Sequence, residues 1–156
     1  MREPAILVVE DDPNDAFLLQ RAFRKARIDS PVLFLQDGQE VLDYLQGSTP
    51  LGHPATGQPL PGLILLDLKM PLMDGFEVLQ WLRARPAFGA VRVVVLSGME
   101  DRATIERAYR LGADEFCCKP EDPTQLVQLV QRLTQSPVRE PQAHSAQVAP
   151  LCLEAT

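Results

Sequence analysis

The chain has 156 residues and a formal net charge of −6, and hydrophobic residues make up 46% of it. That length suits one ordinary domain with its own hydrophobic core. The acidic balance argues against binding to bulk nucleic acid or to an anionic membrane surface, since both need a basic face. No apolar stretch reaches the roughly 18 residues of a membrane span, and no apolar signal region follows the N-terminus, so we expect a cytoplasmic protein.

Five short apolar runs alternate along the chain with five amphipathic segments. An unbroken apolar run bounded by turn residues is typical of a strand buried on both faces of a sheet. The expected strands are Ala5–Val9, Val32–Leu35, Leu63–Leu66, Val91–Leu96 and Glu115–Cys118. The expected helices run from Pro13 to about Ala26, over Gly38–Gln46, from Gly75 to before Pro86, from about Asp101 to Gly112, and over Pro123–Thr134.

Strands that alternate with helices predict a parallel sheet covered on both faces and joined by right-handed crossovers. We therefore expect an α/β fold with a five-stranded parallel sheet in the doubly wound, flavodoxin-like order 2-1-3-4-5. The domain should cover residues 5–135, with Asp12 capping the first helix ahead of Pro13. Gly47–Gly62 carries four Pro and four Gly, so we expect an irregular connection there. Residues 136–156 are expected to form a tail, or an arm on a partner subunit, with no output domain.

Four of the five expected strands end in residues that can do chemistry. The first ends in Glu10 and Asp11, the third in Asp67, the fourth in Ser97 and the fifth in Lys119. The carboxyl ends of parallel strands lie at one edge of a sheet, and in the order 2-1-3-4-5 these four strands are neighbours, about 4.8 Å apart. The sequence therefore predicts one site that contains all five residues.

The chemistry of these residue types points to phosphoryl transfer. Carboxylates this close disfavour one another's ionised state unless a cation is present, and hard oxygen ligands in an open loop suit Mg²⁺. Asp67 is the natural nucleophile, because carboxylates can form aspartyl phosphates. Ser97 can donate a hydrogen bond to a phosphate oxygen, and the long side chain of Lys119 can neutralise charge on the phosphoryl group.

Four motifs carry a resemblance to a known family. They are Val8–Asp12, Leu65–Pro71 followed by Asp74 and Gly75, Leu96–Gly98, and Cys118–Pro120. From about Ala5 to Thr134 the chain resembles the receiver domain of two-component response regulators. The resemblance implies that Asp67 accepts a phosphoryl group from the phosphohistidine of a sensor histidine kinase. Such a protein is not an ordinary enzyme, because it catalyses only its own phosphorylation and dephosphorylation.

The same resemblance implies a metal site. Asp11, Asp67 and the backbone carbonyl of Lys69 would hold Mg²⁺, and Glu10 would assist through a water molecule. Lys69, two residues past Asp67, is a basic side chain where many family members carry a polar or acidic one. Together with Met99 it flanks the path of an attacking water, so both positions should influence the lifetime of the phosphoryl group.

The resemblance further implies a conformational switch. Ser97 and Lys119 would bind the phosphoryl oxygens, Ser97 would move toward them, and Phe116 would turn inward behind it. The surface of the fourth helix, fifth strand and fifth helix would thereby be remodelled, and that face or the C-terminal arm could form a homodimer. A cis peptide bond between Lys119 and Pro120 is expected, as in the family.

Alternative functions stay open at this point. The long connection Gly47–Gly62 resembles that of stand-alone receivers that work with phytochrome-type kinases, so a bacteriophytochrome is a candidate kinase. A phosphorelay intermediate that passes its phosphoryl group to a histidine phosphotransfer protein would have the same motifs. A phosphatase with an aspartyl-phosphate intermediate is disfavoured because Lys69 stands where its general acid should be. A flavin-binding protein is disfavoured because no phosphate-binding loop follows the first strand.

Overall fold

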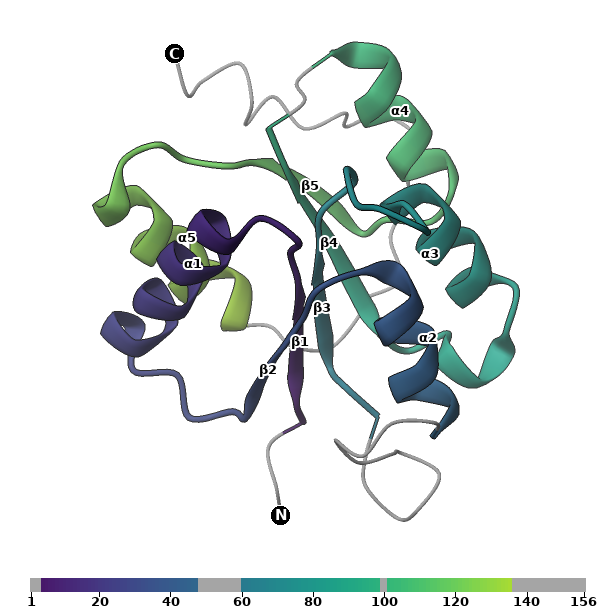
Figure 1. The fold of residues 1–156 in the computed structure, drawn as a ribbon, viewed down its shortest axis with the longest axis horizontal. Helices are drawn as coiled ribbons and strands as arrows, with labels where there is room; N and C mark the ends of the chain where they lie inside the picture. Colours follow the sequence, from purple (N-terminus) through teal and green to yellow (C-terminus); the bar gives the residue numbers. More distant parts are fainter. Residues whose placement is uncertain (1–3, 48–59, 99–100, 136–156) are drawn as a thin grey trace.

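One parallel sheet of five strands forms the centre of the computed structural model, which describes residues 4–47, 60–98 and 101–135 (Figure 1). The strand order is β2-β1-β3-β4-β5, and every neighbouring pair is parallel. The strands are β1 (Ile6–Val9), β2 (Val32–Leu35), β3 (Leu63–Leu66), β4 (Arg92–Ser97) and β5 (Glu115–Cys118). The predicted fold class and strand order are confirmed.

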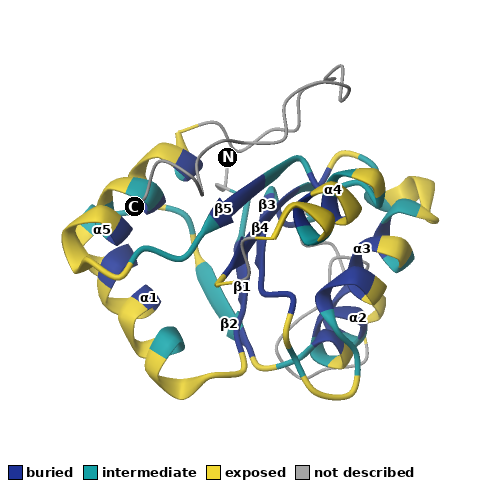
Figure 2. Cartoon of the chain, turned by 90° about the horizontal axis from the view of Figure 1, so that it is seen from above, coloured by how far each residue is buried: buried dark blue, intermediate teal, exposed yellow. Residues whose placement is uncertain are grey.

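Five helices cover the two faces of the sheet. On one face lie α1 (Pro13–Ala26) and α5 (Pro123–Thr134), and on the other lie α2 (Gly38–Gln46), α3 (Gly75–Arg83) and α4 (Arg102–Arg110), as Figure 2 shows. A short 3₁₀ helix, η2 (Pro86–Phe88), follows α3. No helix in the described part of the chain is long and apolar enough to cross a membrane. The predicted connection lies mostly in residues 48–59, and the predicted tail in 136–156, outside the described residues.

Capping side chains fix where the helices begin beside the carboxyl edge of the sheet. The Asp12 carboxylate accepts hydrogen bonds from the backbone N–H groups of Asn14 and Asp15, which confirms it as the cap of α1. At the start of α3, Asp74 and Glu77 form a reciprocal capping box. Both helices therefore start at defined points in the loops that follow β1 and β3.

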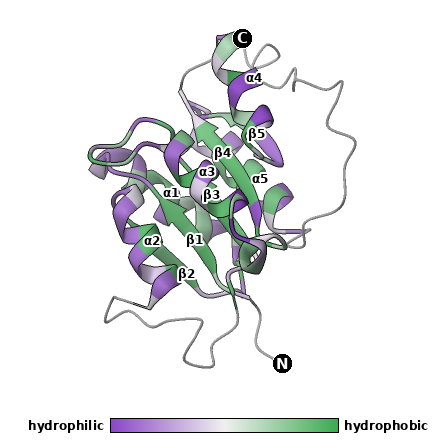
Figure 3. Ribbon diagram, turned by 90° about the vertical axis from the view of Figure 1, so that its right-hand side faces the viewer, coloured by the Kyte–Doolittle hydropathy of each residue, from purple (hydrophilic) through white to green (hydrophobic). Residues whose placement is uncertain are grey.

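Two apolar cores lie on either side of the sheet. Residues facing α1 and α5 make one core, and residues facing α2, α3 and α4 make the other. In Figure 3 the strands are largely hydrophobic, and the helices around them carry both hydrophobic and hydrophilic residues. The helix residues that these cores bury include Leu19, Ala22, Phe23, Val41, Leu42, Leu45, Val78, Leu79, Leu82, Ile105, Ala108, Leu126, Val130 and Leu133.

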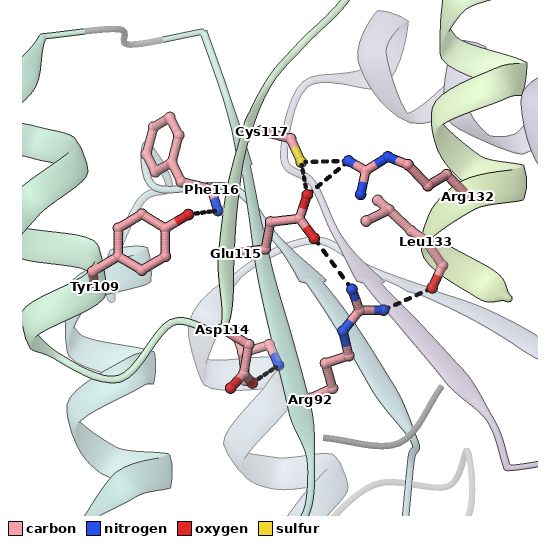
Figure 4. Close-up of polar contacts among 9 residues, drawn as sticks. Arg92, Tyr109, Asp114, Glu115, Phe116, Cys117, Arg132 and Leu133 are labelled. Atoms are coloured by element: carbon pink, nitrogen blue, oxygen red, sulfur yellow. Dashed lines mark hydrogen bonds and ion pairs between the residues drawn. The ribbon is translucent and has the colours of Figure 1, made fainter. Parts of the chain in front are cut away.

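Ion pairs fasten the edge strand β5 to its neighbours (Figure 4). The Glu115 carboxylate lies 3.2 Å from Arg92 of β4 and 2.7 Å from Arg132 of α5. Arg92 also donates a hydrogen bond to the carbonyl of Leu133. These contacts link β4, β5 and α5, so they hold the edge strand β5 in place against its neighbours.

Candidate functional site

Buried polar side chains gather where the strands end. Glu10 follows β1, Asp67 follows β3, and Ser97 is the last residue of β4; their residues are only 4%, 6% and 1% exposed. Within the described residues, these three make up the whole set of polar or charged residues classed as buried. Burial of polar and charged groups costs free energy unless they are paired. Their concentration at one edge therefore marks this place as a site rather than as ordinary core.

Lys119 supplies the positive charge of the site. It follows β5 directly, and its Nζ lies 2.7 Å from Glu10 Oε1, 2.9 Å from Asp15 Oδ2 and 3.5 Å from Asp67 Oδ2. The strand order thus brings the side chain from the edge strand β5 to the ends of β1 and β3, as the sequence predicts. Asp15, from the first turn of α1, is a partner that the sequence analysis missed.

The electrostatics of the cluster favour bound protons or cations. Burial of the Glu10 carboxyl raises its pKa from 4.5 to about 7, although the hydrogen bond from Lys119 opposes this, and the charge of Asp67 adds to it. For Lys119, burial alone would lower the pKa, but hydrogen bonds to Glu10 and Asp15 and the charge of Asp67 outweigh it and raise the pKa above its usual value. Burial is thus the main cause of the raised pKa of Glu10, whereas the neighbouring carboxylates are the cause of the raised pKa of Lys119.

Three of the carboxylates fit a divalent metal ion. Ligand atoms of Glu10, Asp11 and Asp67 all lie within 4.8 Å of one another. Oxygen ligands of this kind suit a hard cation such as Mg²⁺, which keeps several of its waters. Asp11 is exposed while the other two are buried, so the cluster is open to solvent on one side. The donor set and the access therefore both fit the ion that the sequence predicts.

The loop from β3 to α3 folds closely against Asp67. The Lys69 N–H donates a long hydrogen bond of 3.4 Å to Asp67 Oδ1. Gly75 donates to the Leu68 carbonyl, and a Cβ at Gly75 would lie 2.5 Å from the carbonyl oxygen of Asp67. Only glycine permits this approach. A groove of about 560 Å³ opens beside the site, lined by Asp11, Leu68, Lys69, Met70, Pro71, Asp74, Phe76 and Arg107.

The two residues of the predicted switch lie on β4 and β5. Val95 of β4 pairs with both Leu66 of β3 and Phe116 of β5, so Phe116 lies in the strand next to Ser97. The Phe116 ring is already fully buried, and its backbone N–H donates to the hydroxyl of Tyr109 in α4 (Figure 4).

One backbone expectation is wrong. No cis peptide bond occurs in the described residues, so the bond between Lys119 and Pro120 is trans. Trans is the isomer that a bond before proline ordinarily favours, by about 0.5–1 kcal/mol. With this trans bond, the Lys119 side chain still reaches Glu10 and Asp67. The position of the ammonium therefore does not require the cis isomer.

Comparison with known proteins identifies the family. The model of the response regulator receiver domain matches residues 6–131. The chain belongs to the response regulator receiver family. It is therefore a signalling domain of two-component systems. One solved structure that it resembles is the Mn²⁺-bound form of the response regulator Rcp1, with a TM-score of 0.72 at 30% identity over 85% of this chain and 93% of Rcp1.

Similar proteins include regulators from archaea and cyanobacteria. The probable methanogenesis regulatory protein FilR2 of Methanothrix harundinacea is 36% identical over 115 residues, which cover 74% of this chain and 71% of FilR2. The response regulator Rcp1 of Synechocystis is 32% identical over 126 residues, 81% of this chain and 83% of Rcp1. The phosphorylated cyanobacterial phytochrome response regulator RcpA superposes with a TM-score of 0.75 at 29% identity, over 88% of this chain and 99% of RcpA.

Proposed function

We propose that this receiver domain accepts a phosphoryl group on Asp67 from a sensor histidine kinase, in a reaction that requires Mg²⁺. The observation that carries the proposal is the pair of buried carboxylates, Glu10 and Asp67, around the Lys119 ammonium, with Ser97 buried at the end of the neighbouring strand β4. Buried carboxylates beside one lysine are costly for stability. A phosphoacceptor site explains why all four residues lie together, whereas a separate structural role for each residue does not explain the cluster.

Each residue has a distinct part in the proposed transfer. An Asp67 carboxylate oxygen forms a bond to phosphorus while the bond from phosphorus to the imidazole nitrogen of the donor breaks. Lys119, now 3.5 Å from Asp67, pairs with a phosphoryl oxygen, and the Ser97 hydroxyl donates to another. The groove beside the site leaves room for the donor to approach from solvent.

The metal would be held by Asp11, Asp67 and the backbone carbonyl of Lys69, with Glu10 acting through water. When bound, it would neutralise charge on the phosphoryl oxygens.

We propose that phosphorylation is read out through α4, β5 and α5. Ser97 and Phe116 would link the site to this face, and Tyr109 contacts the Phe116 amide from α4. A phosphoryl group that draws Ser97 toward it shifts the balance between two packings of these elements. The face would then bind a downstream protein or a second copy of the chain.

A bacteriophytochrome is our candidate for the kinase. RcpA is a phytochrome response regulator, and another structural match, AtBRR, is a bacteriophytochrome response regulator with a TM-score of 0.69 at 33% identity. The chain covers 99% of RcpA and 94% of AtBRR in these superpositions.

The decisive experiment is phosphorylation by a small acyl phosphate with and without Mg²⁺, followed by intact mass. We expect the native chain to gain one phosphoryl group only with Mg²⁺, and Asp67→Asn to gain none. Asp29→Asn is the matched control, because Asp29 is exposed and lies beyond the far end of α1. Failure of the native chain to gain mass, with Mg²⁺ present and the fold intact, would overturn the proposal.

A second experiment separates the candidate partners. A bacteriophytochrome kinase of the same organism, phosphorylated first, should transfer its label to the native chain faster than an unrelated histidine kinase does. Equal rates from both would remove the phytochrome link. Transfer of the label onward to a histidine phosphotransfer protein would instead favour the phosphorelay alternative.

A further inference from the structure

Asp15 is a fourth carboxylate at the site, and neither the metal cluster nor the proposed transfer uses it. We propose that Asp15 is a positioning residue that holds the Lys119 ammonium toward α1 and competes with the phosphoryl group for it. The inference rests on the proposed function of Asp67. It concerns how tightly the site binds the phosphoryl group, which the metal ligands alone do not determine.

The contact itself is close. Asp15 Oδ2 lies 2.9 Å from Lys119 Nζ, while Asp67 Oδ2 lies 3.5 Å from the same atom. The Lys119 side chain is 20% exposed and that of Asp15 is 38% exposed, so the pair is partly shielded from solvent. In this structure Lys119 is therefore paired more closely with Asp15 than with Asp67, the proposed phosphoacceptor.

The backbone of Asp15 is fixed where the contact needs it. Its N–H donates to the Asp12 carboxylate, in the capping turn of α1. A carboxylate in the first turn of a helix is favourable for the helix dipole without any partner. That structural role does not account for a hydrogen bond to a lysine 104 residues away. The pairing with Lys119 thus calls for an additional explanation.

Competition follows from counting donors and acceptors. An ammonium has three donors, and Lys119 Nζ has three carboxylate partners, Glu10, Asp15 and Asp67. A divalent ion would draw on Glu10 and Asp67, which belong to the acidic cluster, but Asp15 does not belong to it. Asp15 therefore stays with Lys119 when the metal is bound.

The sign of the effect follows from charge. The Asp15 carboxylate attracts the same ammonium that a phosphoryl oxygen needs, and it repels the phosphoryl oxygens themselves. Both effects weaken binding of the phosphoryl group. In the metal-loaded site the phosphoryl oxygens themselves pair with the Lys119 ammonium when Asp15 is neutralised. Removal of the Asp15 charge should therefore strengthen binding of the phosphoryl group rather than disorder the lysine.

The test is titration of the full chain with beryllofluoride, a mimic of the phosphoryl group, at saturating Mg²⁺ in a calorimeter. Asp15→Asn is compared with the native chain and with Asp29→Asn, which makes the same change of charge beyond the far end of α1. We expect Asp15→Asn to bind about two- to five-fold more tightly, the range for a partly exposed ion pair, and Asp29→Asn to match the native chain.

A spectroscopic readout tests the contact separately. In Mg²⁺-free protein, the side-chain ¹⁵N signal of Lys119 should shift in Asp15→Asn and stay in place in Asp29→Asn. If the native chain binds beryllofluoride and Asp15→Asn binds no more tightly, the inference is overturned while the proposed function stands. If the native chain binds none, the proposed function fails and the inference fails with it. An unmoved Lys119 signal in Asp15→Asn overturns the contact directly.

Discussion

Replacement of Glu10 by Gln should stabilise the metal-free protein, by an amount that depends on pH. Glu10 has a pKa of about 7 in the folded chain against 4.5 as its ordinary value. A raised pKa means that the fold prefers the protonated carboxyl. Below about pH 4.5, Glu10 therefore leaves the free energy of unfolding unchanged. As the pH rises from about 4.5 toward 7, the free energy of unfolding falls, because Glu10 ionises in the unfolded chain before it ionises in the folded one.

The magnitude follows from the two pKa values. At about 1.4 kcal/mol for each pH unit that separates them, the difference between about 7 and 4.5 amounts to about 3 kcal/mol of lost stability at pH 8. Gln resembles the protonated carboxyl in shape and charge. Glu10→Gln should therefore be about 3 kcal/mol more stable than the native chain at pH 8, and only about 1 kcal/mol more stable at pH 5.

Urea unfolding in EDTA at pH 5 and pH 8 measures this directly, with the slope of the transition checked for equality between variants. Glu121→Gln is the control, since Glu121 is exposed and should change stability by less than about 0.5 kcal/mol. Added Mg²⁺ should stabilise the native chain more than Glu10→Gln and so narrow the gap. A gain that is absent at pH 8, or equal at both pH values, would refute the reasoning.

Three further variants test the scaffold of the site by urea unfolding. Gly75→Ala puts a Cβ 2.5 Å from the Asp67 carbonyl oxygen and should cost about 1–3 kcal/mol; Gly98→Ala, with nothing within 4 Å, is its control, and equal stabilities would contradict the steric argument. Tyr109→Phe removes the acceptor of a β5 amide and should cost about 1–2 kcal/mol; a loss too small to measure would mean that the amide finds another acceptor. Arg83→Met removes the ion pair with the Asp114 carboxylate, 3.0 Å away, and should cost about 3 kcal/mol. A milder loss when both residues are changed to apolar ones would show that loss of the ion pair is the cause.

The fold was predictable because its signals are local. Leu63–Leu66 is a continuous apolar run between Gly62 and Asp67, and the structure buries all four residues in β3. Alternation of such runs with amphipathic segments leaves few arrangements, and the observed strand order is the expected one. The convergence of Glu10, Asp67 and Lys119 follows from that order, because strand ends at one edge must be neighbours.

Other features depend on side-chain directions that a sequence does not encode locally. The pairing of Asp15 with Lys119 joins α1 to the end of β5, and only the packed structure shows which way this partly exposed helix side chain turns. Trp81 stacks on the Phe88 ring, and the Arg85 guanidinium lies 4.0 Å above the Trp81 ring. That arrangement depends on η2, a turn too short to leave a periodic pattern.

The hydroxyl of Tyr109 has a consequence for solubility. β5 is an edge strand of the sheet. An edge strand presents backbone N–H and C=O groups with which a strand of another molecule could pair. The Phe116 N–H is already taken by Tyr109 (Figure 4), so an incoming strand would have to displace a helix side chain before it could pair there. A single phenolic oxygen thus helps to keep copies of this chain from joining sheet to sheet at high concentration.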